Sequence, residues 1–268
     1  MNTRFTLLSR LLQGSLGLAI LPLAGCSFGF GDDHASSSPK PPIASSTLAT
    51  SDMWPSMSAQ SDGSSLKVYA AVLKGGDFVK LDAGDFFSAK VDDQDVVMTI
   101  EPYTDGKVHY LATFPSPTTA TDVVIALHRS AGRTEALQSK TTIPSAFEIT
   151  SAPPASLRLG APLTVSIAPT PTPPSAGTPA SNGDQMTVQF FGTCLEDQPA
   201  LPLTFDANGS ATFDTSALHL KKDATEGCDV GVQVRHETSG PSDAAFANAA
   251  MNPVQGLQER GFTTALIR

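Results

Sequence analysis

The residues best suited to hold a metal ion are an acidic run at residues 92–95 and four dispersed histidines. The run reads Asp-Asp-Gln-Asp, and calcium is held by several converging oxygen ligands. Counted from Asp93, an EF-hand loop fails, because Met98 stands at the glycine position and Thr104 at the closing glutamate position. The histidines are His109, His128, His219 and His236, on separate segments. We therefore expect a solvated turn at 92–95, no metal site and no cofactor.

Two short patterns match strings found around nucleophilic serines. Gly-x-Ser-x-Gly occurs at residues 25–29, and Ser-x-x-Lys occurs at residues 64–67. The first has no strand–turn–helix pattern around it, and the second lacks the companion Ser-Asp-Asn and Lys-Thr-Gly motifs. The sequence also has no glycine-rich phosphate loop and no His-Glu-x-x-His motif. We therefore predict no catalytic residues.

The first 26 residues have the build of a bacterial export signal. Arg4 and Arg10 provide a positive start, and the apolar run that follows is too short and too interrupted by glycine and proline for a spanning helix. It ends in Leu-Ala-Gly-Cys at residues 23–26, which resembles the lipobox of bacterial lipoproteins. The resemblance implies removal of residues 1–25 and acylation of Cys26 as a membrane anchor. Ser27, in place of an aspartate, favours the outer over the inner membrane by the same resemblance.

With Cys26 lipidated, Cys194 and Cys228 remain, and an even pair in an exported chain favours a disulfide. Cys194 follows a predicted strand at 186–191, and Cys228 precedes one at 230–236. If the second domain has one further strand before these two, the strands at 186–191 and 230–236 are the third and sixth of seven. In an immunoglobulin-like sandwich these two strands are antiparallel neighbours in one sheet. The end of one strand then meets the start of the other. The alternative, a redox or metal-binding pair, lacks Cys-x-x-Cys spacing.

The charge balance argues against a nucleic-acid-binding function. The chain has 17 Lys+Arg and 26 Asp+Glu, for a formal net charge of −9. Proteins that bind nucleic acid neutralise phosphates with a Lys/Arg-rich surface, and this composition does not favour one. We therefore expect no nucleic-acid partner.

Behind the signal, the sequence predicts a tether and two β domains. Residues 26–65 are rich in Ser, Pro, Gly and Ala, which predicts a disordered tether. Residues 66–148 and 149–268 each contain six strand-like runs, and the second domain carries a Pro-rich loop at 169–184. The predicted strands are 66–73, 86–91, 96–100, 108–114, 123–128 and 137–143, then 163–167, 186–191, 201–205, 211–214, 230–236 and 262–267. A short helix is expected at 243–250, capped by Ser242.

The number and spacing of the strands resemble immunoglobulin-like or fibronectin-III-like sandwiches. The resemblance implies an all-β chain with two antiparallel β-sandwich domains. The chain departs from the immunoglobulin pattern because its single tryptophan, Trp54, lies in the predicted tether. A single large sandwich or an open barrel is the structural alternative.

We therefore expect a membrane-anchored envelope lipoprotein that acts as a non-enzymatic binding or scaffolding module. Its expected partners are the membrane, through the lipid on Cys26, and an envelope protein of unknown identity. Two alternatives remain open. One is an accessory protein that binds sugars or metals, and the other is an envelope hydrolase whose catalytic residues lie far apart in sequence.

Overall fold

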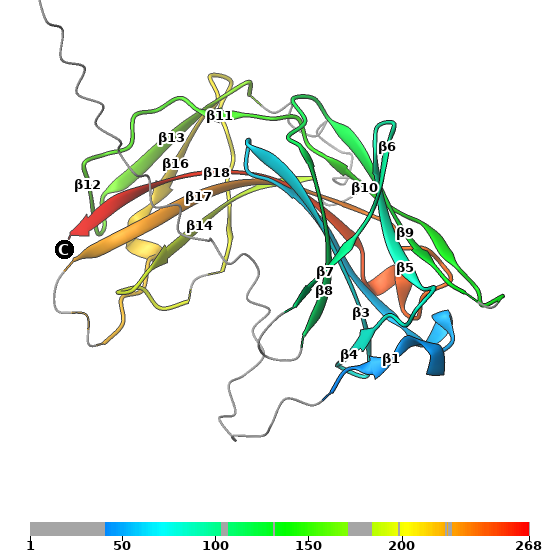
Figure 1. Cartoon of the computed structure of the whole chain (residues 1–268). Helices are drawn as coiled ribbons and strands as arrows, with labels where there is room; N and C mark the ends of the chain where they lie inside the picture. Colours follow the sequence, from blue (N-terminus) through cyan, green and yellow to red (C-terminus); the bar gives the residue numbers. More distant parts are fainter. Residues whose placement is uncertain are drawn as a thin grey trace, which may run out of the picture. The chain divides into compact units, whose positions relative to one another are not determined.

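The computed structural model describes residues 41–102, 107–130, 132–170, 184–197, 199–222, 224 and 227–267. Contacts group the chain from Pro39 to Arg268 as one compact unit, built almost entirely of β-strands (Figure 1). The predicted signal at 1–25, Cys26, and residues 171–183 of the Pro-rich loop lie outside the described residues. None of the helices in the described part combines the length and apolar composition needed to cross a bilayer.

The all-β prediction is confirmed, and the first of two hydrophobic cores lies between two groups of strands. One group belongs to an eleven-stranded sheet, and the other is a four-stranded sheet in the order β10-β9-β5-β6. Alternate side chains point inward, such as Leu66 and Val68 of β3 and Phe87 and Ala89 of β5. The elements around this core are β1 (Ile43–Ala44), η1 (Ser45–Thr47), η2 (Thr50–Asp52), β2 (Trp54–Ser61), β3 (Ser65–Lys74), β4 (Asp77–Lys80), β5 (Phe86–Val91), β6 (Gln94–Val97), β7 (Thr99–Pro102), β8 (Val108–Pro115), β9 (Thr121–His128) and β10 (Ala136–Ile143).

The second core lies between a three-stranded sheet, β11-β13-β16, and the other end of the eleven-stranded sheet. Its inward side chains again alternate along the strands, as in Leu163, Val165 and Ile167 of β13. The elements here are β11 (Glu148–Ile149), β12 (Ser156–Arg158), β13 (Pro162–Ala168), β14 (Gln185–Gly192), β15 (Leu201–Pro202), β16 (Ser210–Asp214), η3 (Thr215–Ala217), β17 (Cys228–Gly240) and β18 (Val254–Ile267). The 3-10 turn η4 (Ala249–Met251), between β17 and β18, packs against the first core.

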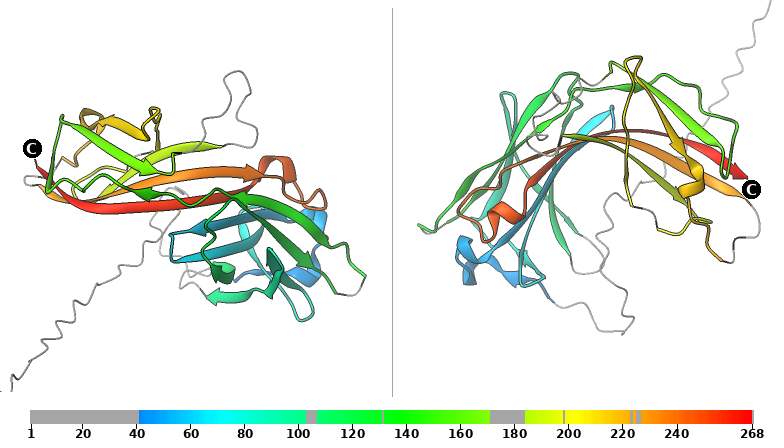
Figure 2. Two further views of the ribbon diagram at one scale, coloured as in Figure 1. Left: turned by 90° about the horizontal axis from the view of Figure 1, so that it is seen from above. Right: turned by 180° about the vertical axis from the view of Figure 1, so that it is seen from behind.

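Strands β17 and β18 are shared by both cores. They pair without interruption from Cys228↔Leu266 to Gly240↔Val254. Val232 packs in the second core and Val254 in the first, and β18 also pairs in parallel with β2. The thirteen residues of β17 cover about 40 Å at roughly 3.3 Å per residue. Figure 2 shows both strands running along the whole length of the unit, so the two cores are joined by continuous sheet rather than by a linker.

Two glycines let β10 pass close to this shared pair of strands. A Cβ atom on Gly240 would lie 2.1 Å from the backbone oxygen of Lys140, and one on Gly256 would lie 2.5 Å from that of Thr142. No side chain fits at these distances. The close approach of backbone to backbone therefore requires glycine at both positions.

The predicted boundaries of the tether and the second domain are corrected by the structure. The tether was expected to reach residue 65, but residues from Ile43 onward are folded, and β2 buries Met57 and Ala59 in the first core. The second domain was expected to hold all of 149–268, but Phe246 and Val254 belong to the first core. The reason is the same in both cases, because β2 and the far end of β18 pair with each other.

Two local predictions are also wrong. The helix expected at 243–250 is a loop with one 3-10 turn, η4. Asp243 accepts a hydrogen bond from the backbone of Ala245, and the Ser242 hydroxyl donates to the carbonyl of Asn252, so both side chains stabilise the loop. The strand expected at 96–100 is two strands, β6 and β7, which belong to different sheets because the chain turns at the buried Met98.

Candidate functional site

The most completely buried charged group in the described chain is the pair formed by Asp85 and Arg129. Asp85 directly precedes β5, and Arg129 directly follows β9. Phe86 and His128 are register partners in this antiparallel pair, so the two charged residues emerge together at one end of the sheet. Arg129 Nε lies 2.9 Å from Asp85 Oδ2, and both side chains have 0% exposure.

Every oxygen of the Asp85 carboxylate has a donor. Oδ2 accepts hydrogen bonds from Arg129 Nε and, at 2.8 Å, from the Ser45 hydroxyl. Oδ1 accepts from the backbone N–H and hydroxyl of Ser130, at 2.8 and 3.0 Å, and from Arg133 Nη2 at 3.0 Å. Burial alone would raise the pKa of Asp85, but the hydrogen bonds from Ser130 and Ser45 and the charge of Arg129 together hold it below its usual range.

The guanidinium of Arg129 ties the start of the folded chain to this carboxylate. Its Nη2 donates to the carbonyl oxygens of Ser45 at 2.9 Å and Leu48 at 3.0 Å, and its Nη1 donates to the Thr50 hydroxyl at 3.1 Å. These three residues lie in or beside the short turns η1 and η2. The cluster is therefore a clamp that holds residues 45–52 against the first sandwich. With no exposed surface on either charged side chain, it is closed to substrate.

The sequence alone does not connect Asp85 with Arg129. The signal that could connect them is their position, since each residue flanks a predicted strand at 86–91 or 123–128. Which strands are neighbours is not encoded locally, and only the pairing of β5 with β9 brings the two side chains together.

A second charged cluster lies on the shared strands β17 and β18. Arg235 and Glu259 are register partners, and Arg235 Nε lies 2.8 Å from Glu259 Oε1. Gln233 Nε2 donates to the other oxygen of Glu259 at 2.9 Å. Burial raises the pKa of Glu259, and the negative charges of the nearby Glu237 and Asp62 raise it further. The positive charge of Arg235 acts in the opposite direction but does not cancel the rise. The cluster joins the two long strands where they pass between the cores.

This raised pKa predicts a pH-dependent contribution to stability. Since Glu259 takes up a proton more readily in the folded than in the unfolded chain, folding is favoured as pH falls from the raised pKa towards about 4.3, the unperturbed glutamate value. Over that interval, the unfolding free energy of the wild type should rise relative to that of a Glu259→Gln variant. Urea unfolding of both proteins from about pH 7 to about pH 4 measures the difference. Parallel pH profiles would contradict this assignment.

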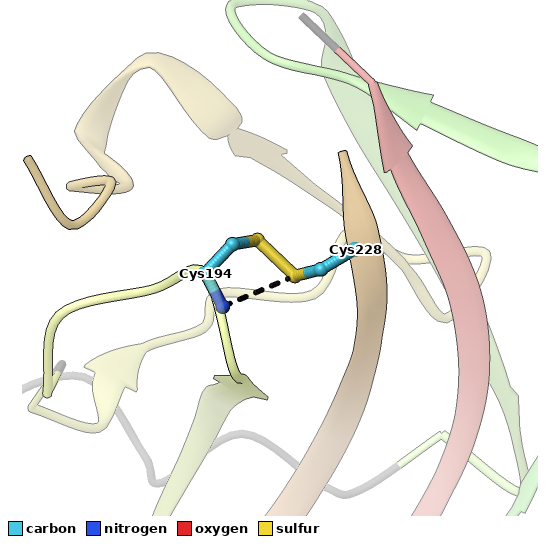
Figure 3. The surroundings of a disulfide bond; sticks show 2 residues. All are labelled: Cys194 and Cys228. Carbon is cyan, nitrogen blue, oxygen red and sulfur yellow. Dashed lines mark hydrogen bonds between the residues drawn. A yellow bond between two sulfur atoms is a disulfide. The ribbon is translucent and has the colours of Figure 1, made fainter. Parts of the chain in front are cut away.

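The predicted disulfide is confirmed. Cys194 and Cys228 are bonded, with an S–S distance of 2.01 Å and Cα atoms 5.9 Å apart (Figure 3). As expected, the end of β14 meets the start of β17, and Gly192 is the register partner of Val230. The backbone N–H of Cys194 also points at the Cys228 sulfur, 3.4 Å away. The bond closes the second sandwich at the end remote from the Asp85 clamp.

The other residues considered for chemistry are placed apart from one another. Asp92 and Asp93 form an exposed two-residue turn between β5 and β6, which is shorter than the turn predicted at 92–95 because Gln94 and Asp95 belong to β6. His128 lies 3.3 Å from Glu135, and His236 lies 2.7 Å from Asp184, on different sandwiches. Within the part of the chain that the structure describes, no three His, Cys, Asp or Glu residues form a group that could hold a metal.

The fold and these clusters define an all-β protein with two sandwiches that share two long strands. No family model and no curated protein sequence matches the chain. Among solved structures, it is similar to the full ectodomain (Ig1–Ig3) of mouse nectin-like molecule 4, with 11% identity over 82% of this chain and 65% of that chain and a TM-score of 0.26. It is also similar to the tandem Ig repeats of Dlar, with 10% identity over 80% and 97% and a TM-score of 0.26.

A further similar structure is the Yersinia pseudotuberculosis adhesin InvE, with 10% identity over 81% of this chain and 60% of that chain and a TM-score of 0.21. The chain thus spans less than two thirds of the length of two of these three structures. At such TM-scores the similarity carries no argument about activity. The fold class rests on the strands, cores and disulfide described above.

Proposed function

We propose that the chain is a lipid-anchored envelope protein that acts as a non-enzymatic binding or scaffolding module. The observation that carries this proposal is the continuous β17–β18 pair, which contributes side chains to both cores and so joins the two sandwiches through sheet. Two sandwiches joined in this way offer two sets of exposed strand faces, loops and edges on one chain. Such surfaces suit a protein that binds or positions partners.

The position of the Asp85 clamp supports the anchored role. It holds residues 45–52, close to the first of the described residues, and β2 continues from there into pairing with β18. A pull on the N-terminal segment is therefore passed to the first core and to the shared strands. The Cys194–Cys228 disulfide gives independent support for export, because disulfides persist in oxidising compartments such as the bacterial periplasm.

The anchor is tested by a Cys26→Ser variant expressed in a bacterium with a lipoprotein pathway. We expect complete loss of metabolic fatty-acid labelling and release of the protein from the membrane fraction, because the thiol is the acyl acceptor and two or three acyl chains are needed for stable attachment. A Cys194→Ser/Cys228→Ser variant is the matched control and should keep its label. Membrane retention of the Cys26→Ser variant would contradict the anchor.

A further inference from the structure

Half of the large apolar residues that are exposed among the described residues lie on three consecutive strands of the first sandwich. Eight large apolar residues are exposed, and four of them lie on β5, β6 and β7: Phe86, Val96, Val97 and Ile100. Val97 is 59% exposed. All four residues of β6 are exposed, which sets this strand apart from its buried neighbours in the same sheet. Exposed apolar side chains on a strand at a sheet edge make this edge a candidate interaction site.

Strand β6 is also an open sheet edge. It ends the order β10-β9-β5-β6 and pairs only with β5. The pair Val91↔Gln94 directly flanks the two-residue turn and is therefore a hydrogen-bonded pair of the hairpin. Hydrogen-bonded pairs alternate along an antiparallel ladder, so Ala89↔Val96 is the next one. The backbone N–H and C=O groups of Asp95 and Val97 therefore point away from β5, towards the place of a further strand. The edge carries no proline and no lysine, residues that commonly block strand addition.

The charged residues around this edge indicate the sign of the charge expected on its binding partner. Asp92, Asp93 and Asp95 lie at one end of β6, and Lys90, the register partner of Asp95, is the basic residue opposite them. A second copy of this chain is a poor occupant, because each copy carries a formal net charge of −9. A strand with a lysine or arginine facing Asp95 and apolar side chains facing Val96 and Val97 is complementary in both charge and polarity.

We propose that β6 binds an extended segment of another protein by strand addition, and that this segment is apolar with a basic residue at the end beside Asp95. The backbone groups of Asp95 and Val97 supply the main-chain hydrogen bonds, and the side chains select the partner. The inference rests on the proposed binding role and names the class of partner. It does not depend on the lipid anchor, so failure of one leaves the other standing.

The probe is a fluorescently labelled ten-residue peptide with two lysines followed by alternating valine and threonine, titrated against the detergent-solubilised full chain. We expect saturable binding that weakens about tenfold or more in two variants. Val97→Pro removes one of the two outward N–H groups of β6, and Asp95→Lys reverses the charge at the other outward position. Asp229→Lys, on the exposed face of β17, makes the same charge change on the second sandwich and should bind within about twofold of wild type.

Four results would overturn the proposal: no binding up to about millimolar peptide, equal binding of a peptide with glutamates in place of the lysines, equal binding by Val97→Pro, or equal loss in Asp229→Lys. Sedimentation of the chain without peptide tests whether a second copy occupies the edge. Dimers that are present in the wild type and absent in Val97→Pro would assign the edge to a second copy. Circular dichroism verifies that each variant is folded. If Val97→Pro does not fold, Asp95→Lys against Asp229→Lys decides the question.

Discussion

Replacing Arg129 with methionine should lower the free energy of unfolding by about 3–5 kcal/mol, the usual cost of removing one member of a buried ion pair. The substitution leaves the Asp85 carboxylate fully buried with its main charged partner gone, and it leaves the carbonyl groups of Ser45 and Leu48 without that donor. Chemical denaturation of wild type and variant measures the loss. The matched control is Arg133→Met, which removes a partly exposed donor to the same carboxylate and should cost clearly less.

The same clamp predicts a pH signature and a double-mutant result. Because the pKa of Asp85 is lowered in the folded state, its contribution is present above about pH 3.9, the unperturbed value, and is lost as pH falls through the lowered folded value. The difference between wild type and Arg129→Met should therefore shrink in acid. An Asp85→Ala/Arg129→Met double variant should lose less than the sum of the single losses. Additive losses, or a loss below about 1 kcal/mol in Arg129→Met, would contradict the clamp.

Removing the Cys194–Cys228 disulfide is the second large change. The bond joins residues 34 positions apart, and a double Cys→Ala variant should lose about 3–4 kcal/mol of unfolding free energy in the loop-entropy model, because the unfolded chain regains the freedom that the bond restricts. Thermal and urea unfolding of wild type and variant measure the loss. Wild-type protein unfolded in the presence of a strong reductant is the control and should show a similar loss. A change below about 1 kcal/mol would contradict a stabilising role.

Much of the strand content is predictable from local patterns, because β13 alternates aliphatic residues with polar ones and β9 is rich in the β-branched residues Val, Ile and Thr. Strand β2 is not, because its sequence Trp-Pro-Ser-Met-Ser-Ala-Gln-Ser has small polar residues and a proline, which favour a linker. Its place in the core comes from long-range pairing with β3 and β18. The extensions of β17 and β18 beyond the predicted strands are unpredictable for the same reason, since β17 ends in Glu-Thr-Ser-Gly and β18 begins with Val-Gln-Gly-Leu-Gln-Glu-Arg-Gly.

The disulfide was predictable, and the clamp was not, for a physical reason. Only two cysteines remain once Cys26 is assigned to the predicted lipid anchor, so only one disulfide pairing is left. The antiparallel order of the strands predicted at 186–191 and 230–236 is enough to bring these two cysteines together. Asp85 and Arg129 are two among many charged residues. Their meeting depends on which strands become neighbours, and residues 45–52, which complete the clamp, were assigned to the tether. The unpaired edge at β6 likewise follows from sheet order, which no local pattern contains.

In the proposed function, a lipid-anchored β-protein binds another envelope component. This claim is tested most directly by in-cell cross-linking followed by affinity purification of the wild-type chain and of Cys26→Ser. We expect one envelope protein in near-stoichiometric amount with the anchored form and its loss with the unanchored form. An empty purification of the anchored form would contradict the claim and favour a small ligand or an enzymatic role. Equal recovery by both forms would contradict the part assigned to the anchor.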